Sequence, residues 1–268
     1  MRGPQALLDS EDHHVTEMGA WFPGERVVFR GKDLHGELGR VEWLDLYMFA
    51  ITGRHLPYRH LQMINALWVH TSFPDPRLWN NQVSALAGTA RSTGNLAIAA
   101  SLAVSEATIY GRRADIRAID FLLNTRSAMD AGADLGEIVE ERLAESRSVP
   151  GYGRPVVSQD ERIRNLMPLV EEFGFSEGQY VQLAFQIERF LESKRRRLRL
   201  NYGGLAAALG AEMGLSVKEH YLGSMMAFLA GMIPCFLDAD SKPEGSLLPL
   251  RCSRLEYQGR PRRAWPCG

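Results

Sequence analysis

The sequence predicts an all-α protein. Only one short segment has the alternation of a β-strand, and apolar residues recur at helical spacing in most of the longer segments. Of the 268 residues, 45% are hydrophobic and 24% are charged, which excludes a disordered chain, a collagen and a disulfide scaffold. At roughly 100–200 residues per domain, this length allows one large globular unit or two interlocked ones.

The expected elements follow in chain order. Glu25–Arg30 has the β-branched alternation of a short strand, and a turn at Gly31 ends it. The Ala-rich segment Leu96–Ala107 is apolar almost all round, which is typical of a buried helix. The other expected helices, most of them separated by Gly or Pro, are Val41–Thr52, Leu61–Val69, Val83–Ala90, Asp115–Ala131, Leu135–Ser146, Asp160–Phe173, Gly178–Leu198, Leu205–Met213 and Val217–Phe236.

Two glycine-rich interruptions, Pro150–Pro155 and Asn201–Gly204, suggest how the chain is divided. The segment between them is strongly charged, whereas the flanking helices are rich in Ala and Leu. We therefore expect a smaller lobe over residues 111–202, inserted into a larger helical lobe made from residues 1–110 and 203–268. A cleft between two lobes is a common place for a small ligand.

The overall charge excludes strongly basic or acidic function classes. Lys and Arg total 31 against 32 Asp and Glu, so no net charge drives the protein onto nucleic acid or a membrane surface. The longest apolar stretch, Met225–Leu237, contains Pro234 and is much shorter than the about 20 residues of a membrane-spanning helix. The N-terminus lacks the apolar core of a secretory signal. We expect a soluble, cytoplasmic protein.

The three cysteines do not predict a metal site. Cys235, Cys252 and Cys267 include no CxxC pair, and no His follows them at zinc-finger spacing. We expect Cys235 to be a small core residue, the other two to be incidental thiols, and no metal to be bound.

Four segments, taken in order, resemble the citrate synthase superfamily, especially its short members of the citryl-CoA lyase type. The likeness covers most of the chain, from about Gly24 to Arg262. Pro23–Pro57 resembles the family's opening strand and Thr-Gly-Arg turn, and Val149–Ile163 resembles its Pro-Gly-Phe-Gly-His loop. Leu200–Leu215 resembles its Leu-Asn-Val-Asp-Gly segment, and Leu255–Arg262 resembles its Tyr-x-Gly-Pro tail.

The resemblance implies an all-α, two-lobed homodimer whose lobes close over a coenzyme A thioester and a keto acid. In the family, an Asp removes the proton next to the thioester carbonyl. One His stabilises the enolate oxygen, a second His polarises the keto group, and arginines hold the carboxylates. Because the carbon acid is weak, a positioned base and preorganised donors must share the barrier.

The sequence departs from this pattern at the catalytic positions. No His occurs between residues 71 and 219, where both family histidines would fall. Ala114 stands at or near the first of these positions, and Arg154 stands at the second. Gly203 matches the family Asp, and a shift of one residue would offer Tyr202 instead. Losing a general base costs about 10²–10⁴-fold in rate, so ordinary citrate synthesis should be nearly abolished.

The carboxylate-binding positions are only partly kept. The helix Ser224–Asp238 places Phe228 where the family has an Arg and Cys235 where it has a His. Arg162, in contrast, matches the Arg of the family's Asp-Pro-Arg sequence. Arg162 is therefore the best single candidate for binding a substrate carboxylate, with Tyr202 and Gly203 as its expected neighbours.

Two groups near the expected catalytic loops remain open to two interpretations each. Arg154 either touches an anionic ligand in the cleft or bonds nearby carbonyls, and as a permanent cation it cannot act as a base. Arg112, Arg113 and Arg117 lie among Asp115 and Asp120; they form either a solvated or dimer-facing cluster of salt bridges or a remodelled wall of the active site. In the second case Arg113 would bind substrate, and Asp115 is the only carboxylate there that could replace the base.

The basic run Lys194–Arg199 has three interpretations. It is a solvated helix end favoured by the helix dipole, a contact of Arg196 and Arg197 with coenzyme A phosphates, or a nucleic-acid footprint, which six residues without interleaved aromatics support only weakly.

The leading functional hypothesis is a citrate synthase-like acyltransferase or lyase that binds an acyl-CoA or a related carboxylate and uses altered catalytic residues. The alternative is an inactive homologue that acts as a binding or regulatory subunit, paired with an active paralogue. A helical nucleic-acid-binding module is a distant third.

Overall fold

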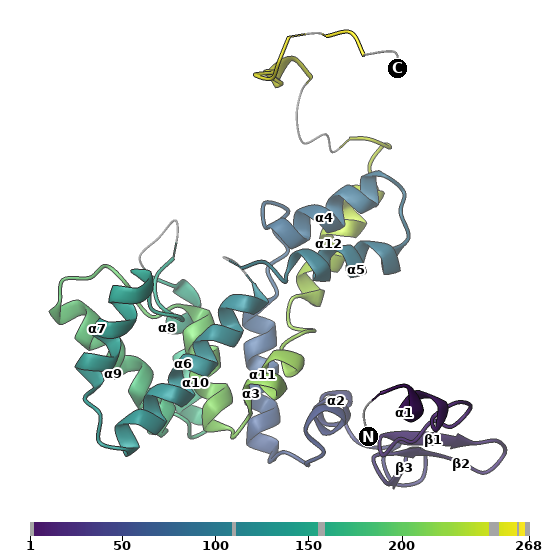
Figure 1. The fold of residues 1–268 in the computed structure, drawn as a ribbon, viewed down its shortest axis with the longest axis horizontal. Helices are drawn as coiled ribbons and strands as arrows, with labels where there is room; N and C mark the ends of the chain where they lie inside the picture. Colours follow the sequence, from purple (N-terminus) through teal and green to yellow (C-terminus); the bar gives the residue numbers. More distant parts are fainter. Residues whose placement is uncertain (1–2, 109–110, 155–158, 247–251, 262, 266–268) are drawn as a thin grey trace. The chain divides into compact units, whose positions relative to one another are not determined.

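In a computed structural model, the chain is described over residues 3–108, 111–154, 159–246, 252–261 and 263–265. These residues form twelve α-helices and one small three-stranded sheet, which confirms the predicted all-α class (Figure 1). Arg262, Cys267 and the loop residues 155–158, which belong to segments discussed above, lie outside the described residues. None of the helices in the described ranges is long and apolar enough to cross a membrane.

The chain divides into two compact units. The first unit contains Met1–Thr71 and Glu106–Ala227, and the second contains Ser72–Ser105 and Phe228–Gly268. The first unit includes the whole of residues 111–202, for which the sequence predicts a separate small lobe. That lobe boundary stays a prediction.

The first unit begins with the short helix α1 (Pro4–Leu8) and the antiparallel sheet β1–β2–β3. The predicted strand is β2 (Arg26–Phe29), which pairs with β1 (Gly19–Phe22) on one side and β3 (Lys32–Asp33) on the other. Between β1 and β2 the backbone N–H of Glu25 donates to the carbonyl of Phe22, and Gly24 takes a positive φ of 76° that favours glycine. The sequence did not predict β1, because its Gly and Ala residues have low β-propensity.

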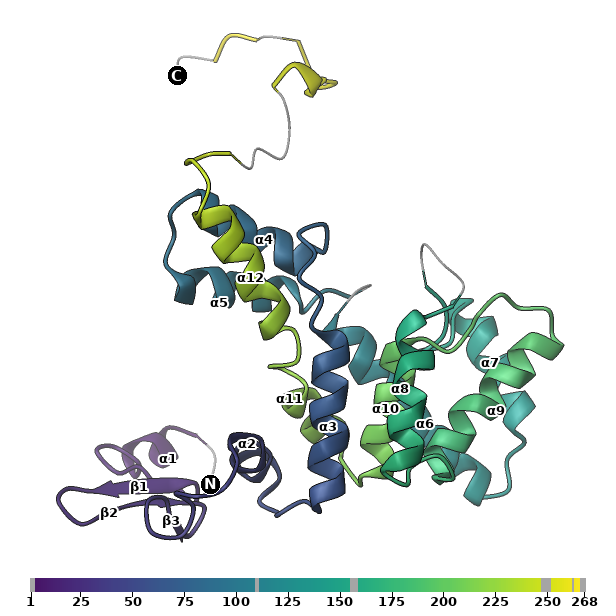
Figure 2. The same cartoon turned by 180° about the vertical axis from the view of Figure 1, so that it is seen from behind.

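The core of the first unit surrounds α10 (Tyr202–Glu212), whose apolar residues Leu205, Ala207 and Leu209 are fully buried. Figure 2 shows α10 among neighbouring helices, and it contacts α6, α8, α9 and α11. Because α10 is apolar on every side, it can be covered all round. The other helices of this unit are α2 (Trp43–Thr52), α3 (Tyr58–Thr71), α6 (Arg112–Asp130), α7 (Leu135–Ser146), α8 (Glu161–Glu172), α9 (Gln179–Ser193) and α11 (Val217–Gly223).

Side-chain caps fix where several of these helices begin. The side chains of Asp134, Asp160 and Asn201 accept backbone N–H groups at the starts of α7, α8 and α10. Ser216 and Glu219 form a reciprocal capping box at the start of α11. These caps place the N-termini of α8 and α10 at defined points, and the candidate site lies there.

Two predicted helices differ most from the structure. Helix α9 stops at Ser193 instead of Leu198, because Arg195 takes a left-handed φ of 57° and turns the chain out of the helix. The predicted helix Val217–Phe236 is two helices, α11 and α12 (Leu229–Asp240). Its apolar pattern continues across the break, but the chain passes there from the first unit to the second.

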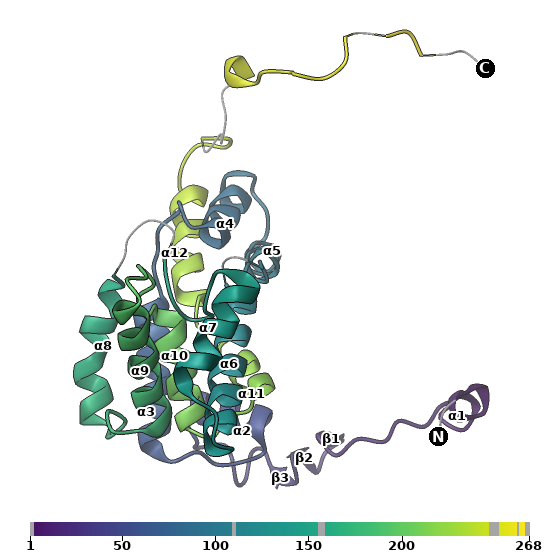
Figure 3. The ribbon, with the colours of Figure 1, turned by 60° about the vertical axis from the view of Figure 1, so that its left-hand side comes forward.

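The second unit contains α4 (Trp79–Thr89), α5 (Gly94–Val104) and α12, which pack against one another (Figure 3). It also includes the 3₁₀ turn Cys252–Arg254. The Ser84 hydroxyl donates to the Met232 carbonyl, and Cys235 is buried with Ala85 and Ala239, as expected for a small core residue. The prediction that α5 is buried all round is wrong. Ala97 and Ser101 are its buried residues, and Leu96 is 64% exposed.

A close backbone approach in the first unit gives a test of the fold. A Cβ on Gly204 would collide with the carbonyl oxygen and Cα of Gly151, two backbone atoms of the loop before α8. Gly204→Ala should therefore lower the free energy of unfolding by about 1–3 kcal/mol, measured by urea denaturation. Gly94→Ala, at the open start of α5, is the matched control and should leave stability nearly unchanged. Equal stability of the two variants would contradict this packing.

Candidate functional site

The site is organised by the carboxylate of Asp160, whose side chain is fully buried at the start of α8. Arg162 forms a two-pronged contact with it, from Nε to Oδ1 at 2.8 Å and from Nη2 to Oδ2 at 2.7 Å. The backbone N–H of Tyr202, at the start of α10, donates to Oδ2 at 2.9 Å. One carboxylate thus joins the N-termini of two helices and fixes the Arg162 guanidinium.

The ionisation of this pair follows from its surroundings. Burial alone would raise the pKa of Asp160, but the hydrogen bonds from Arg162 and Tyr202 outweigh it, so the pKa is lower than usual. Burial alone would lower the pKa of Arg162, but the contact with Asp160 outweighs this effect, so the pKa is higher than usual. Both groups are therefore charged at neutral pH.

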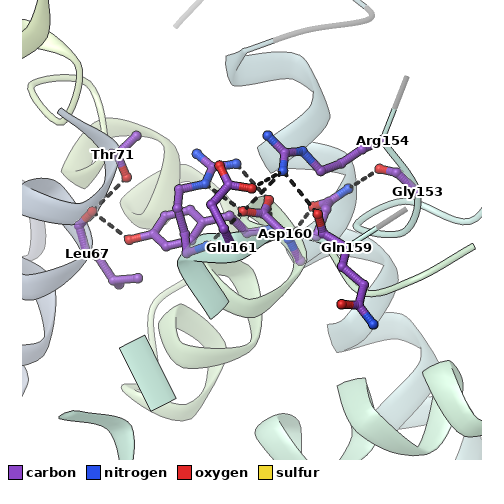
Figure 4. Close-up of polar contacts among 11 residues, drawn as sticks. Leu67, Thr71, Gly153, Arg154, Gln159, Asp160 and Glu161 are labelled. Atoms are coloured by element: carbon purple, nitrogen blue, oxygen red, sulfur yellow. Dashed lines mark hydrogen bonds and ion pairs between the residues drawn. The ribbon is translucent and has the colours of Figure 1, made fainter. Parts of the chain in front are cut away.

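Arg154 adds a second guanidinium to the same carboxylate. Its Nη1 lies 3.7 Å from Oδ1 of Asp160 and 2.6 Å from Oε2 of Glu161, and it donates to the carbonyl of Gln159 at 3.3 Å (Figure 4). A bond to a nearby carbonyl, one of the two interpretations of Arg154, is therefore present, and its contact with a ligand stays a prediction. The main partner is nevertheless the Glu161 carboxylate, whose side chain is 57% exposed.

Tyr202 is held in place and cannot replace the missing base. The Arg162 guanidinium lies over its ring, 4.4 Å from the centroid, and its hydroxyl donates to the Leu67 carbonyl at 2.7 Å. Figure 4 shows Thr71 bonded to the same Leu67 carbonyl. Burial raises the pKa of Tyr202 to about 12, so the hydroxyl remains protonated.

Asp115 and Gly203, which are 88 residues apart in the chain (203 minus 115), come together where α6 packs against α10. A Cβ added to Gly203 would lie only 2.8 Å from Oδ1 of Asp115. Burial raises the pKa of Asp115 to about 6, although Arg112 and Arg162 both act to lower it. Its carboxyl group therefore changes charge close to neutral pH.

The arginines at the start of α6 lie on different faces of the helix, one buried and one exposed. Arg112 is only 2% exposed, with Nη1 3.8 Å from Oδ2 of Asp115, whereas Arg113 is exposed. The sequence analysis placed Arg112 in the basic cluster but did not predict that it is buried. Its spacing could have indicated this, since it lies seven residues before the buried Ile119 and ten before Leu122, on one face of the helix.

A buried histidine was also missed by the sequence analysis. The His220 ring packs against Gly210 of α10, where a Cβ would collide with it. Burial, assisted by the charge of Arg112, lowers the pKa of His220 to about 4, so this imidazole is neutral at physiological pH.

The basic run after α9 borders a separate cavity of about 440 Å³. Arg196 lines this cavity, and Arg197, the next residue, is exposed. The ammonium group of Lys194 is paired with Glu140. The cavity is also lined by Glu140, Lys194, Leu143, Ala144 and Arg195.

The raised pKa of Asp115 predicts a dependence of stability on pH. Its pKa moves from the ordinary 3.8 to about 6 on folding, so its ionisation destabilises the folded protein as the pH rises through about 6. Asp115→Asn cannot ionise. In urea denaturation it should be on the order of 2 kcal/mol more stable than the wild type at about pH 7.5, relative to their difference at about pH 4.

Asp130, an exposed carboxylate at the other end of α6, offers the matched control Asp130→Asn, which should not change this difference. An Asp115→Asn protein that loses stability as the pH rises as steeply as the wild type would contradict the buried setting of Asp115.

No protein-family model matches the chain, and no curated protein matches its sequence. Several solved structures match its fold. The citryl-CoA lyase from Hydrogenobacter thermophilus superposes with a TM-score of 0.81 at 20% identity, over 94% of this chain and 97% of that one. The ATP citrate lyase from Methanothrix soehngenii, solved with citrate and coenzyme A, has a TM-score of 0.75 at 17% identity, over 97% of this chain and 45% of that one.

The citrate synthase from Thermoplasma acidophilum, solved with carboxymethyl coenzyme A and oxaloacetate, has a TM-score of 0.62 at 18% identity. That match covers 84% of this chain and 58% of the synthase chain. The chain thus spans about half the length of the ATP citrate lyase and more than half that of the synthase. At these identities the likeness concerns the fold, and the chain has the citrate synthase-like helical fold.

Proposed function

We propose that this protein binds a coenzyme A thioester together with a small carboxylate and makes or breaks a carbon–carbon bond between them, as a lyase or an acyltransferase. The observation that carries the proposal is the pair of guanidinium groups, Arg154 and Arg162, held at one buried carboxylate in a chain with this fold. Two of the structural neighbours were solved with coenzyme A compounds and with citrate or oxaloacetate.

Arg154 and Glu161 form the part of the site where a ligand carboxylate binds. The Asp160 carboxylate fixes both arginines, while the Glu161 side chain is 57% exposed and pairs with the outer guanidinium, that of Arg154. A guanidinium binds any carboxylate through the same planar donors, so a ligand carboxylate exchanges with that of Glu161. Arg162, stacked on Tyr202, holds the inner end of the ligand, and Arg113 and Gly203 border it.

The basic run after α9 provides for the phosphates of the thioester. The cavity of about 440 Å³ is within the range of small-molecule sites, and its Arg196 and Arg195 suit phosphate oxygens. Arg197, exposed directly beside it, adds a third cation. Nucleic acid is not part of this proposal.

A second copy of the chain covers α5 in our proposal, which agrees with the homodimer that the resemblance implies. Ser101 of the helix and Ser105 directly after it lie inward, both at most 1% exposed, whereas Leu96 and Val104 are exposed. Exposed apolar residues on a helix that buries polar ones are typical of a protein–protein interface.

The alternative is a binding or regulatory subunit without turnover that pairs with an active paralogue in the cytoplasm. It is favoured by Gly203, which places no side chain at the first turn of α10, and by the two arginines, each of which already has a carboxylate partner in the chain. Turnover of acetyl-CoA with oxaloacetate, or of citryl-CoA, by the isolated chain would exclude it.

The exchange of carboxylates at Arg154 can be measured by titrating citrate calorimetrically into the purified full-length chain. Glu161→Gln removes the competing carboxylate and should tighten citrate binding several-fold. Arg154→Gln should weaken it about 10- to 100-fold, the value of a hydrogen bond to a charged group. Glu172→Gln, at the far end of α8, is the matched control and should bind citrate as the wild type does.

The same protein should show a raised melting temperature with acetyl-CoA. A wild type that gains no thermal stability from acetyl-CoA and no binding heat from citrate would contradict the proposed function.

A further inference from the structure

Gly203 has no side chain, and the carboxyl of another helix occupies the space beside it. It is the second residue of α10, and its Cβ would lie 2.8 Å from Oδ1 of Asp115 and 3.4 Å from Oδ1 of Asn201. Its φ is not positive, so the backbone does not require glycine there. A glycine within a helix costs about 1 kcal/mol relative to alanine. The glycine is explained by the room that it leaves for Asp115.

The charged groups around Asp115 place it beside the proposed carboxylate subsite. Arg112 lies on its own helix with Nη1 at 3.8 Å, and Arg162 of α8 acts on it electrostatically. The charge of Asp115 acts to raise the pKa of Tyr202 of α10, and the charge of Arg112 lowers the pKa of His220 of α11. Since 23% of the Asp115 side chain is exposed, part of this side chain is open to a small molecule.

A carboxyl group that titrates near pH 6 is suited to moving protons at neutral pH. Its ionised form is a stronger base than an ordinary Asp, and its protonated form is populated enough to return the proton. The other carboxylate of the site, Asp160, has a lowered pKa because Arg162 and Tyr202 bond to it. Asp160 is therefore a poor base, and the two carboxylates have different roles.

We propose that Asp115, projecting from α6 into the space left open by Gly203 on α10, is the residue that transfers the proton at the carbon next to the thioester carbonyl. This inference rests on the proposed function. In the condensing direction Asp115 takes that proton, and the electrons of the C–H bond form the enolate. The enolate attacks the keto carbon, the new carbon–carbon bond forms, and the keto oxygen becomes a hydroxyl with a proton from solvent. In cleavage each step reverses, and protonated Asp115 gives its proton to the enolate carbon.

The proton transfer can be measured without a complete reaction. Wild-type protein with acetyl-CoA in D₂O should exchange the methyl hydrogens for deuterium, followed by mass spectrometry, with and without oxaloacetate to fill the carboxylate subsite. Asp115→Asn should lower the exchange rate at least about 100-fold. Its binding of acetyl-CoA should stay within about threefold of the wild type. The control Asp130→Asn, on the same helix, should exchange at the wild-type rate.

Moving the carboxyl group from α6 to α10 tests where that group must lie as well as which residue carries it. Asp115→Ala combined with Gly203→Asp moves the carboxylate from α6 to α10 within the same space, and it should regain at least about tenfold of the exchange lost in Asp115→Ala alone. Gly203→Asp alone should lose exchange, because two carboxyl groups then compete for one place. The wild-type exchange rate should rise with pH through about 6 and then level off, and the relocated variant should show a different midpoint.

The outcomes separate this inference from the function on which it rests. Exchange by Asp115→Asn at the wild-type rate overturns the assignment of Asp115. A relocated variant that folds but regains no exchange overturns the shared position with Gly203. A wild type that binds acetyl-CoA without any exchange overturns the proton transfer and leaves the proposed binding intact, whereas a wild type that does not bind acetyl-CoA contradicts the proposed function itself.

Discussion

The arrangement of the site depends on the buried carboxylate of Asp160. A carboxylate taken out of water is destabilised by several kcal/mol unless its oxygens are satisfied, and here Arg162, the N–H of Tyr202 and the start of α8 satisfy them. These contacts join the first turns of α8 and α10, which are separated in the chain by the rest of α8 and by α9. They also hold Arg162 over the Tyr202 ring, so the cation next to Asp115 has a fixed position.

The first turn of α10 shows how small residues create room for polar ones. Gly204 allows the backbone of Gly151 to approach, while Gly203 allows the carboxyl of Asp115 to approach. Asn201 caps the helix and also donates to the carbonyl of Gly153. The loop before α8, the start of α6 and the start of α10 therefore meet at one place, which brings a titrating carboxyl group next to two guanidinium groups in a fold that other proteins use with coenzyme A.

The sequence predicted most of the helices, because apolar periodicity and capping residues such as Asn201 are local signals. It could not predict the break between α11 and α12, since both sides of the break are apolar and its cause is the passage from one unit to the other. It identified Arg154, Arg162 and Asp115 as candidates, but Glu161 as the partner of Arg154 and the contact of Asp115 with Gly203 depend on tertiary packing. Arg112 was named within the basic cluster, but its burial was not predicted, because an arginine is rarely buried unless it has a charged partner.

The most direct test of the account is the effect of Asp160→Asn on the free energy of unfolding, measured by urea denaturation from about pH 3 to about pH 8. The substitution keeps the shape of the side chain but leaves the Arg162 guanidinium without its carboxylate. The account predicts a loss of about 3 kcal/mol or more at neutral pH, together with a smaller dependence of stability on pH in the acid range, where the wild-type carboxylate is protonated. A neutral-pH stability within about 0.5 kcal/mol of the wild type would contradict the central role of Asp160.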